Sequence, residues 1–260
     1  LENSQTITCF AETTIDFIVR EKPSVLLDNE AVICMDENPS LDISVLNPNA
    51  LFSYNWTNEN GTQIGTGETL TISNGGLYNV TAISDFMCIS EEAQINVTEN
   101  LPPDITENDV TTNTENTNSI TINNINIPPD LYEYSLLNSN GSVVYNYQDN
   151  PVFNNLDLGL FTVLVRSKNN CGEDSVQVSF IDFPDFFTPN GDGINDLWII
   201  KGFNHSFYPS SDIFIYDRFG KKMAQLPPEN PSWNGLYKGK KMPSTDYWYR
   251  VILVDIYGRK

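Results

Sequence analysis

Short runs in which apolar and polar residues alternate restrict the fold of this chain more than any other feature. Apolar side chains occupy alternate positions at Leu41–Val45, Tyr54–Trp56, Ile120–Ile122, Val176–Phe180 and Tyr247–Leu253. This period of two places one face of an extended strand in a core. Turn-forming stretches such as NENGT, SNGG, NSNGS and DRFG separate the runs, and no segment shows a helical period. Short strands between tight turns are typical of antiparallel sandwiches or barrels, so the sequence predicts an all-β protein.

Part of the chain repeats after 83 residues. GGLYNVTAISDFMCISEEAQINV and LGLFTVLVRSKNNCGEDSVQVSF each place a glycine before Leu-aromatic-x-Val, with Cys88 and Cys171 each 12 residues after that glycine. The offset is close to the length of one immunoglobulin-type sandwich. We therefore predict two tandem Ig-like β-sandwiches, at residues 22–100 and 101–183. Residues 1–21 then form the tail of a preceding repeat, and residues 184–260 form a small third β domain.

The formal charge of −20 is concentrated in the first 184 residues. They carry four basic and 26 acidic side chains, whereas residues 185–260 carry ten and eight, which gives −22 and +2. Such a division indicates a modular chain. The acidic part argues against nucleic acid as a partner, and no apolar run reaches the roughly 18 residues of a membrane-spanning helix. The opening residues LENSQTITCF do not form an export leader, so we expect the sequence to be part of a longer protein.

The cysteines fit the repeat. Cys34 lies near the start of the first complete unit and Cys88 near its end, so we predict a disulfide between them. It would close a loop of about 55 residues and contribute about 4 kcal/mol in the chain-entropy model. Cys9 would have its partner outside this sequence, and Cys171 has no mate in its own unit. Disulfide formation would indicate folding outside the cytosol.

The stretch NGDGIND is a candidate metal site. Oxygen-bearing groups recur at Asn190, Asp192 and Asp196, with the Ile194 carbonyl between them. This spacing suits Ca²⁺, which takes six or more oxygen ligands, although the glycines are misplaced for an EF-hand. A pair of Asx turns would explain the same residues without an ion. We therefore regard calcium as a possible cofactor and expect a structural role for the loop in either case.

Catalytic groups are poorly represented. The single histidine, His205, has no acidic neighbour in GFNHSFYP, and the four cysteines lack the CxxC spacing of zinc sites. The sequence therefore predicts that the protein is not an enzyme. Aromatic residues crowd the last segment, where most should form a core. Some could form a docking face with the lysines of FGKKM and YKGKKMP, which suit charged hairpin turns equally well.

The final segment resembles a known family. FFTPNGDGINDLW, DIFIYDRFGKKM, WNGLYKGKKMPSTDYWYRVILVD and GRK are similar to the type B C-terminal sorting domain of the type IX secretion system. The same module is called the gliding motility-associated C-terminal domain and occurs in Bacteroidetes. The upstream units resemble the Ig-like repeats of large surface adhesins. Where relatives carry Gly-Trp-Asp-Gly, this chain has Ser232-Trp233-Asn234-Gly235. Relatives continue through one more short strand, so we expect the domain to lack its last few residues here.

The resemblance implies that the last domain is an address without enzymatic activity. It would carry the protein through the outer-membrane translocon and then dock to a PorP/SprF-like outer-membrane β-barrel, which would place the protein at the cell surface, associated with the outer membrane. The positions that match the family's motifs are implied to carry the sorting signal: Phe187, Pro189, Asp192, Asp196, Arg218, Trp233, Asp246, Tyr247 and Trp248.

Other functions are compatible with the sequence. The Ig-like units could bind a glycan or a protein, with the C-terminal domain as a structural cap. A glycan site would need exposed aromatic rings, for which Trp56 and Tyr145 are candidates, although their place in the alternation favours the core. The chain could also be a structural spacer, whose location would survive deletion of residues 186–260.

Overall fold

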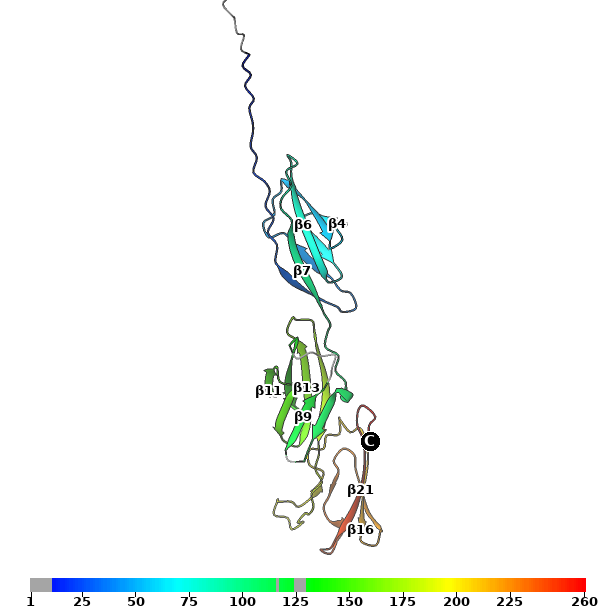
Figure 1. Cartoon of the computed structure of the whole chain (residues 1–260). Helices are drawn as coiled ribbons and strands as arrows, with labels where there is room; N and C mark the ends of the chain where they lie inside the picture. The colour runs from blue at the N-terminus through cyan, green and yellow to red at the C-terminus, as the bar shows by residue number, and fades with distance from the viewer. Residues whose placement is uncertain (1–10, 116, 124–129) are drawn as a thin grey trace, which may run out of the picture. The chain divides into compact units, whose positions relative to one another are not determined.

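The computed structural model describes residues 11–115, 117–123 and 130–260. These residues form strands almost throughout, and their one helical segment is a single 3₁₀ turn, η1 (Glu107–Asp109). The all-β prediction is therefore confirmed. Contacts divide the chain into two compact units. The first contains residues up to Ile33 together with Asn38–Glu99, and the second contains Cys34–Glu37 and Asn100–Lys260. Figure 1 shows both units.

The first unit is a sandwich of two sheets. The larger sheet has the strand order β1 (Glu30–Cys34), β7 (Ala93–Asn100), β6 (Gly76–Ser84), β3 (Phe52–Asn58) and β4 (Gln63–Thr66). The smaller sheet pairs β2 (Leu41–Ser44) with β5 (Thr69–Ile72). Alternate residues of these strands form the core, among them Ile43, Trp56 and Val80. Residues 11–28 of the described chain contain no strand.

A second sandwich begins the second unit. One sheet has the order β11 (Val143–Gln148), β10 (Tyr132–Asn138), β13 (Gly159–Ser167) and β14 (Glu173–Phe180). The other has the order β12 (Val152–Leu156), β9 (Asn118–Ile122) and β8 (Val110–Asn113). Tyr134, Leu136, Phe153 and Val163 pack between the sheets. Strand β14 lies at the edge of its sheet, where only β13 pairs with it.

Three small sheets complete the second unit. The largest has the order β17 (Lys222–Leu226), β16 (Ser210–Asp217) and β21 (Tyr247–Val254). The others pair β15 (Trp198–Ile199) with β18 (Ser232–Trp233), and β19 (Leu236–Tyr237) with β20 (Lys240–Lys241). Trp198, Ile213, Ile215 and Trp233 form the centre of a separate apolar cluster. The prediction that residues 101–183 and 184–260 are separate domains stays a prediction, since both lie in one compact unit.

One turn motif recurs four times, at Asn58–Thr62, Asn138–Ser142, Asp217–Lys221 and Asp255–Arg259. In each, the side-chain oxygen of the first residue accepts hydrogen bonds from the amides two and four positions later. The fourth residue is a glycine with positive φ, a conformation that glycine adopts at least cost. The first three turns connect paired strands. The fourth follows β21, which lies at the edge of its sheet.

The predicted Cys34–Cys88 disulfide is wrong. Cys34 bonds to Cys171, with 5.1 Å between their Cα atoms, and Cys88 is a free thiol. The reason is the position of β1 beside β7. The Met35 amide donates to the Asn100 carbonyl at the end of β7, whereas Cys88 precedes the start of that strand. An eight-residue strand spans roughly 25 Å, far beyond the Cα separation of about 7 Å that a disulfide allows. Cys9 lies outside the described residues.

Candidate functional site

A hollow lies in the C-terminal part of the second unit. A cavity of about 710 Å³ opens between residues 184–190 and 241–249, with Trp198, Ile215, Trp233 and Gly235 at its base. The first segment is the loop after the second sandwich, and the second leads into β21. Concave sites lined by apolar groups and a few polar ones are where partners commonly bind. The cavity is therefore the candidate functional site.

Fixed aromatic rings form its wall. The Trp233 ring lies 5.4 Å from Phe187 and 5.0 Å from Tyr247, measured between ring centroids. Trp198 lies 5.1 Å from Tyr249. Each indole N–H is satisfied by the backbone, since Trp198 donates to the Pro184 carbonyl and Trp233 to the Leu236 carbonyl, both at 3.0 Å. Burial raises the pKa of Tyr247 above its usual value. These rings make the wall ordered and largely apolar, while Asp185, Lys241 and Asp246 add charged groups to the lining.

Gly235 allows the loop carrying Phe187 to close on Trp233. Its φ is +73°, and a Cβ atom added there would lie 3.2 Å from the Pro189 side chain and 3.3 Å from the Phe187 ring. Both the backbone conformation and the close approach therefore favour glycine. The sequence WNG thus sets part of the shape of the cavity.

Strand β21 divides its residues between two environments. Tyr249 and Val251 pair with Ile215 and Ile213 and face the core side of the sheet. The alternate residues Trp248 and Arg250 pair with Tyr216 and Phe214 on the opposite face. Trp248 is 67% exposed, and Phe186 at the other lip of the cavity is 68% exposed. Exposed aromatic side chains beside a cavity are typical anchors for a protein partner.

Basic residues surround this region. Lys221 and Lys238 lie 4.7 Å and 5.6 Å from the centre of the Tyr237 ring, and Lys222 lies 5.4 Å from that of Phe214. Lys241 lines the cavity itself. Lys221 closes the turn between β16 and β17, and Lys238 lies in the turn between β19 and β20. The lysine clusters therefore occupy hairpin turns and at the same time give the aromatic surface a positive rim.

The NGDGIND loop is held by its own side chains. The Asp196 carboxylate accepts hydrogen bonds from the amides of Gly191 and Gly193, both at 2.7 Å, and from the Asn190 amide at 3.0 Å. These backbone donors hold the pKa of Asp196 below its usual value. Asn190 and Asp192 each accept an amide hydrogen two residues along the chain. These bonds are those of Asx turns, which hold the loop without an ion, and calcium binding stays a prediction.

Six of the nine predicted sorting residues line the cavity. They are Phe187, Pro189, Trp233, Asp246, Tyr247 and Trp248. Asp192 and Asp196 lie in the neighbouring loop, and Arg218 lies in the β16–β17 turn with its guanidinium 4.9 Å from the Phe219 ring centre. The predicted sorting residues did not include Phe186, Lys241 or Tyr249, although Lys241 and Tyr249 belong to the lysines and aromatic residues that were candidates for a docking face. The sequence could have indicated Phe186, because two consecutive aromatic residues in an extended segment point to opposite sides.

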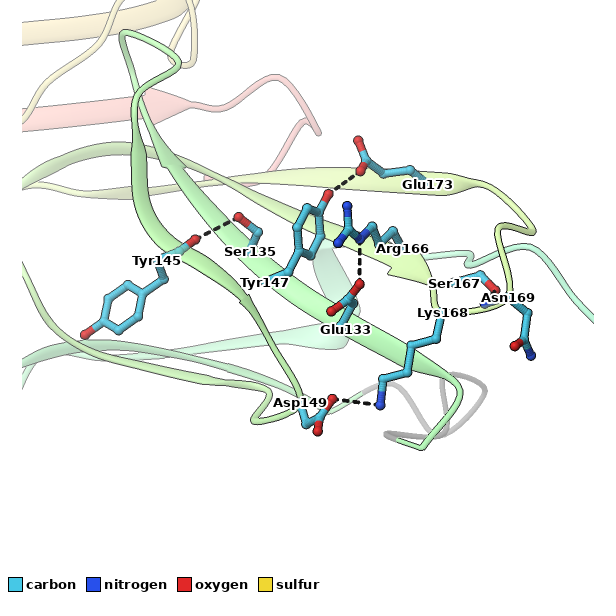
Figure 2. Close-up of polar contacts among 10 residues, drawn as sticks. All are labelled: Glu133, Ser135, Tyr145, Tyr147, Asp149, Arg166, Ser167, Lys168, Asn169 and Glu173. Carbon is cyan, nitrogen blue, oxygen red and sulfur yellow. Dashed lines mark hydrogen bonds and ion pairs between the residues drawn. The ribbon is translucent and has the colours of Figure 1, made fainter.

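A second group of polar side chains lies on the second sandwich (Figure 2). The Arg166 guanidinium stacks 3.6 Å from the centre of the Tyr147 ring and donates to Glu133 at 2.6 Å, while the Tyr147 hydroxyl donates to Glu173. Lys168 pairs with Asp149 at 2.7 Å. Arg166 and Lys168 pair with Glu133 and Asp149, whereas Glu173 accepts only the neutral Tyr147 hydroxyl, so the group carries one net negative charge. These cross-strand contacts link the strands of one sheet, and the group therefore stabilises that sheet.

The two aromatic residues considered for a glycan site, Trp56 and Tyr145, instead pack within the sandwiches. Trp56 is fully buried and donates its indole N–H to the Gly67 carbonyl, so it cannot stack on a glycan. Tyr145 packs 5.2 Å from Phe153 and donates its hydroxyl to the Asn154 carbonyl. Within the described ranges, no three His, Cys, Asp or Glu side chains gather as they would around a metal ion. No helix described here has the length and apolar character needed to cross a bilayer.

Comparison with known proteins identifies the C-terminal region. Residues 181–258 match the family model described as CHU_C Type IX secretion signal domain. No curated protein matches the chain. Among solved structures, fibronectin(III)-like modules of Clostridium thermocellum CbhA are 14% identical, with 60% of this chain and 93% of theirs covered and a TM-score of 0.37. The titin I-band fragment I67-I69 is 14% identical, with 90% and 89% covered and a TM-score of 0.35.

Proposed function

We propose that this chain, whose residues 181–258 form a type IX secretion signal domain, is the C-terminal part of an adhesin-like surface protein that docks to a PorP/SprF-like outer-membrane β-barrel. A signal of this class directs export to the cell surface or the medium. Secretion signals and Ig-like folds are typically non-enzymatic. The adhesin role, the barrel partner and the association with the outer membrane are the parts that we propose.

The observation that carries the docking proposal is the exposed aromatic surface beside the cavity. Trp248 and Phe186 are each about two-thirds exposed, although the surrounding rings are packed and hydrogen-bonded. Interfaces are rich in aromatic and arginine side chains, and a few buried anchors contribute most of the binding energy. The rigid wall limits the entropy that a partner would have to remove on binding.

The distribution of charge along the chain supports docking through the same surface. Residues 185–260 carry a net charge of +2, whereas the preceding 184 carry −22. A basic rim around an apolar centre would orient the domain toward an acidic partner surface and increase the association rate. The strongly acidic upstream sandwiches would be repelled by an acidic partner surface and would not compete for it.

The docking proposal is tested by binding of the full chain to a detergent-solubilised barrel of the PorP/SprF type. We expect Trp248→Ala to weaken binding by at least about tenfold, as for an interface anchor. Phe86→Ala is the matched control, because Phe86 is an aromatic residue of the first unit that is 60% exposed and does not line the cavity. Equal binding of both variants and the parent chain would contradict docking through this surface.

A further inference from the structure

Strand β14 of the second sandwich is held from outside by two segments of the C-terminal region. As the edge strand of its sheet, β14 has one row of backbone groups that β13 does not pair. Unpaired edges are normally covered or charged, because they otherwise attract other strands. Here the covering elements are residues 201–208, which lie within the family-matched region, and residues 255–259, of which all but the last lie within it.

Gly202 makes the closest approach. Its φ is +72°, and an added Cβ atom would lie 2.3 Å from the Phe180 carbonyl oxygen and 2.7 Å from the Gly159 amide nitrogen. Next to it, Lys201 and Asp182 exchange two backbone hydrogen bonds of 2.9 Å and 3.1 Å and form an ion pair at 3.7 Å. The segment is therefore seated directly on the ends of β13 and β14.

Tyr257 makes the second attachment. Its hydroxyl accepts a hydrogen bond of 2.8 Å from the Gln177 amide in the middle of β14, and its ring packs on the core of the second sandwich. Phe207 is 2% exposed and lies 6.1 Å from the Tyr257 ring and 4.9 Å from Tyr208. Burial raises the pKa of Tyr208, whose hydroxyl also lies near Ser179 of β14.

The turn that carries Tyr257 is itself ordered. Asp255 is buried and accepts amide hydrogens from Tyr257 and Arg259 at 3.0 Å and 2.9 Å, together with the Arg259 side chain at 2.7 Å. Since this turn directly follows β21, the position of Tyr257 is linked to the strand that carries Trp248. Tyr257, which contacts β14, and Trp248, which belongs to the aromatic surface, thus lie at opposite ends of one short, continuous segment.

We propose that β14 is a functional part of the export signal, and that Gly202 and Tyr257 are positioning residues through which the second sandwich orders the signal domain. The functional signal would then extend beyond residues 181–258 into the preceding sandwich. Separation of the second sandwich from the signal domain would expose the Tyr257 ring and leave the Gln177 amide without its protein acceptor, so the signal region would lose order together with the contact. This inference rests on the proposed export function.

A pair of glycine variants of the full chain tests the proposal. Gly202→Ala introduces both the cost of a positive φ and the collision with β14. Gly141→Ala, in the β10–β11 turn, introduces the same backbone cost at a φ of +76° with no atom within 4 Å of the new Cβ. We expect Gly202→Ala, relative to Gly141→Ala, to increase hydrogen exchange at least about tenfold in peptides covering residues 173–180, 201–208 and 247–254. Tyr257→Phe, which keeps the ring, should accelerate exchange mainly at residues 173–180.

Export of the same chains, each fused behind a periplasmic leader in a bacterium with a type IX system, supplies the functional readout. We expect Gly202→Ala to reduce export at least about fivefold while Gly141→Ala matches the parent chain, as for loss of a locally ordered element. If the parent chain is exported and both variants match it in export and exchange, the role of β14 is refuted and the export function stands. If the parent chain is not exported, the proposed function fails and this inference fails with it.

Discussion

The Tyr147 hydroxyl donates to Glu173 on the outer face of the second sandwich (Figure 2). Burial, together with the hydrogen bond and the charge of Glu173, raises the pKa of Tyr147 to about 12. Because the folded pKa lies above that of an unfolded tyrosine, the contribution of this group to stability is complete below about pH 10 and is lost as the pH approaches about 12.

The effect of Glu173 on Tyr147 can be measured. We expect Glu173→Gln to lower the pKa of Tyr147, because it removes the neighbouring negative charge, but not to abolish the shift, because burial remains its largest cause. Ultraviolet absorption titration, with Tyr147→Phe to identify the signal, gives this value. An unchanged tyrosine titration in Glu173→Gln would contradict the arrangement.

Gly235 offers a second test at the scale of single residues. We expect Gly235→Ala to destabilise the second unit by about 2–3 kcal/mol, from positive φ and from crowding of Phe187 and Pro189. Gly239→Ala, at a φ of +75° in open space, should cost only about 1 kcal/mol. Urea unfolding followed by tryptophan fluorescence separates the two. Equal losses would show that the close approach at Gly235 is absent.

Among the structural elements, the repeated Asn/Asp-x-x-Gly turn explains why the hairpins form where they do. In Asn138–Ser142 the Asn138 side chain accepts amide hydrogens from Asn140 and Ser142, both at 3.0 Å. We expect Asn138→Ala to cost about 1–2 kcal/mol, which lowers the melting temperature by about 2–8 °C for a unit of this size. The exposed neighbour Asn140, replaced by Ala, is the control and should change the melting temperature by less than about 2 °C. Similar shifts would mean that the turn is not held by Asn138.

The disulfide makes a further prediction at this scale. The bridge joins residues 137 apart, so replacing Cys34 and Cys171 together by serine should lower the free energy of unfolding of the second unit by about 2–4 kcal/mol. Cys88→Ser should have little effect, since Cys88 forms no disulfide. Non-reducing peptide mapping checks the pairing first. A peptide linking Cys34 to Cys88 would contradict it.

The sequence predicted the strands well and the cysteine pairing badly, for one physical reason. Alternation of apolar residues is local, and it identified strands around Trp56, Val178 and Val251 correctly. The pairing of Cys34 depends on β1 lying alongside β7, a non-local contact that spacing along the chain does not encode. The same distinction applies to the cavity. Motifs indicated Phe187, Trp233 and Trp248, and the alternation at Tyr247–Leu253 already separated Tyr249 from Trp248. The meeting of residues 184–190 with residues 241–249 around the cavity is a non-local contact that the motifs do not encode.

At the scale of the whole molecule, the chain combines an acidic Ig-like array with a basic, aromatic C-terminal region that matches a secretion signal domain. Within the described ranges no three His, Cys, Asp or Glu side chains gather as they would around a metal ion, and a cavity with aromatic walls lies in the signal domain. The match to a secretion signal supports the proposal that the array is cargo and the signal domain its address. The contact of β14 with the signal domain gives the address a structured base within the same unit.

An export assay of the parent chain shows whether the C-terminal region is an export signal. The chain, behind a periplasmic leader and a fluorescent reporter, is produced in a bacterium with a type IX system and in the same strain lacking its PorP/SprF-like protein. We predict surface or medium fluorescence in the first strain and its loss from the surface in the second. Fluorescence confined to the periplasm of both strains, with an intact fusion, would contradict the central claim that the C-terminal region is an export signal.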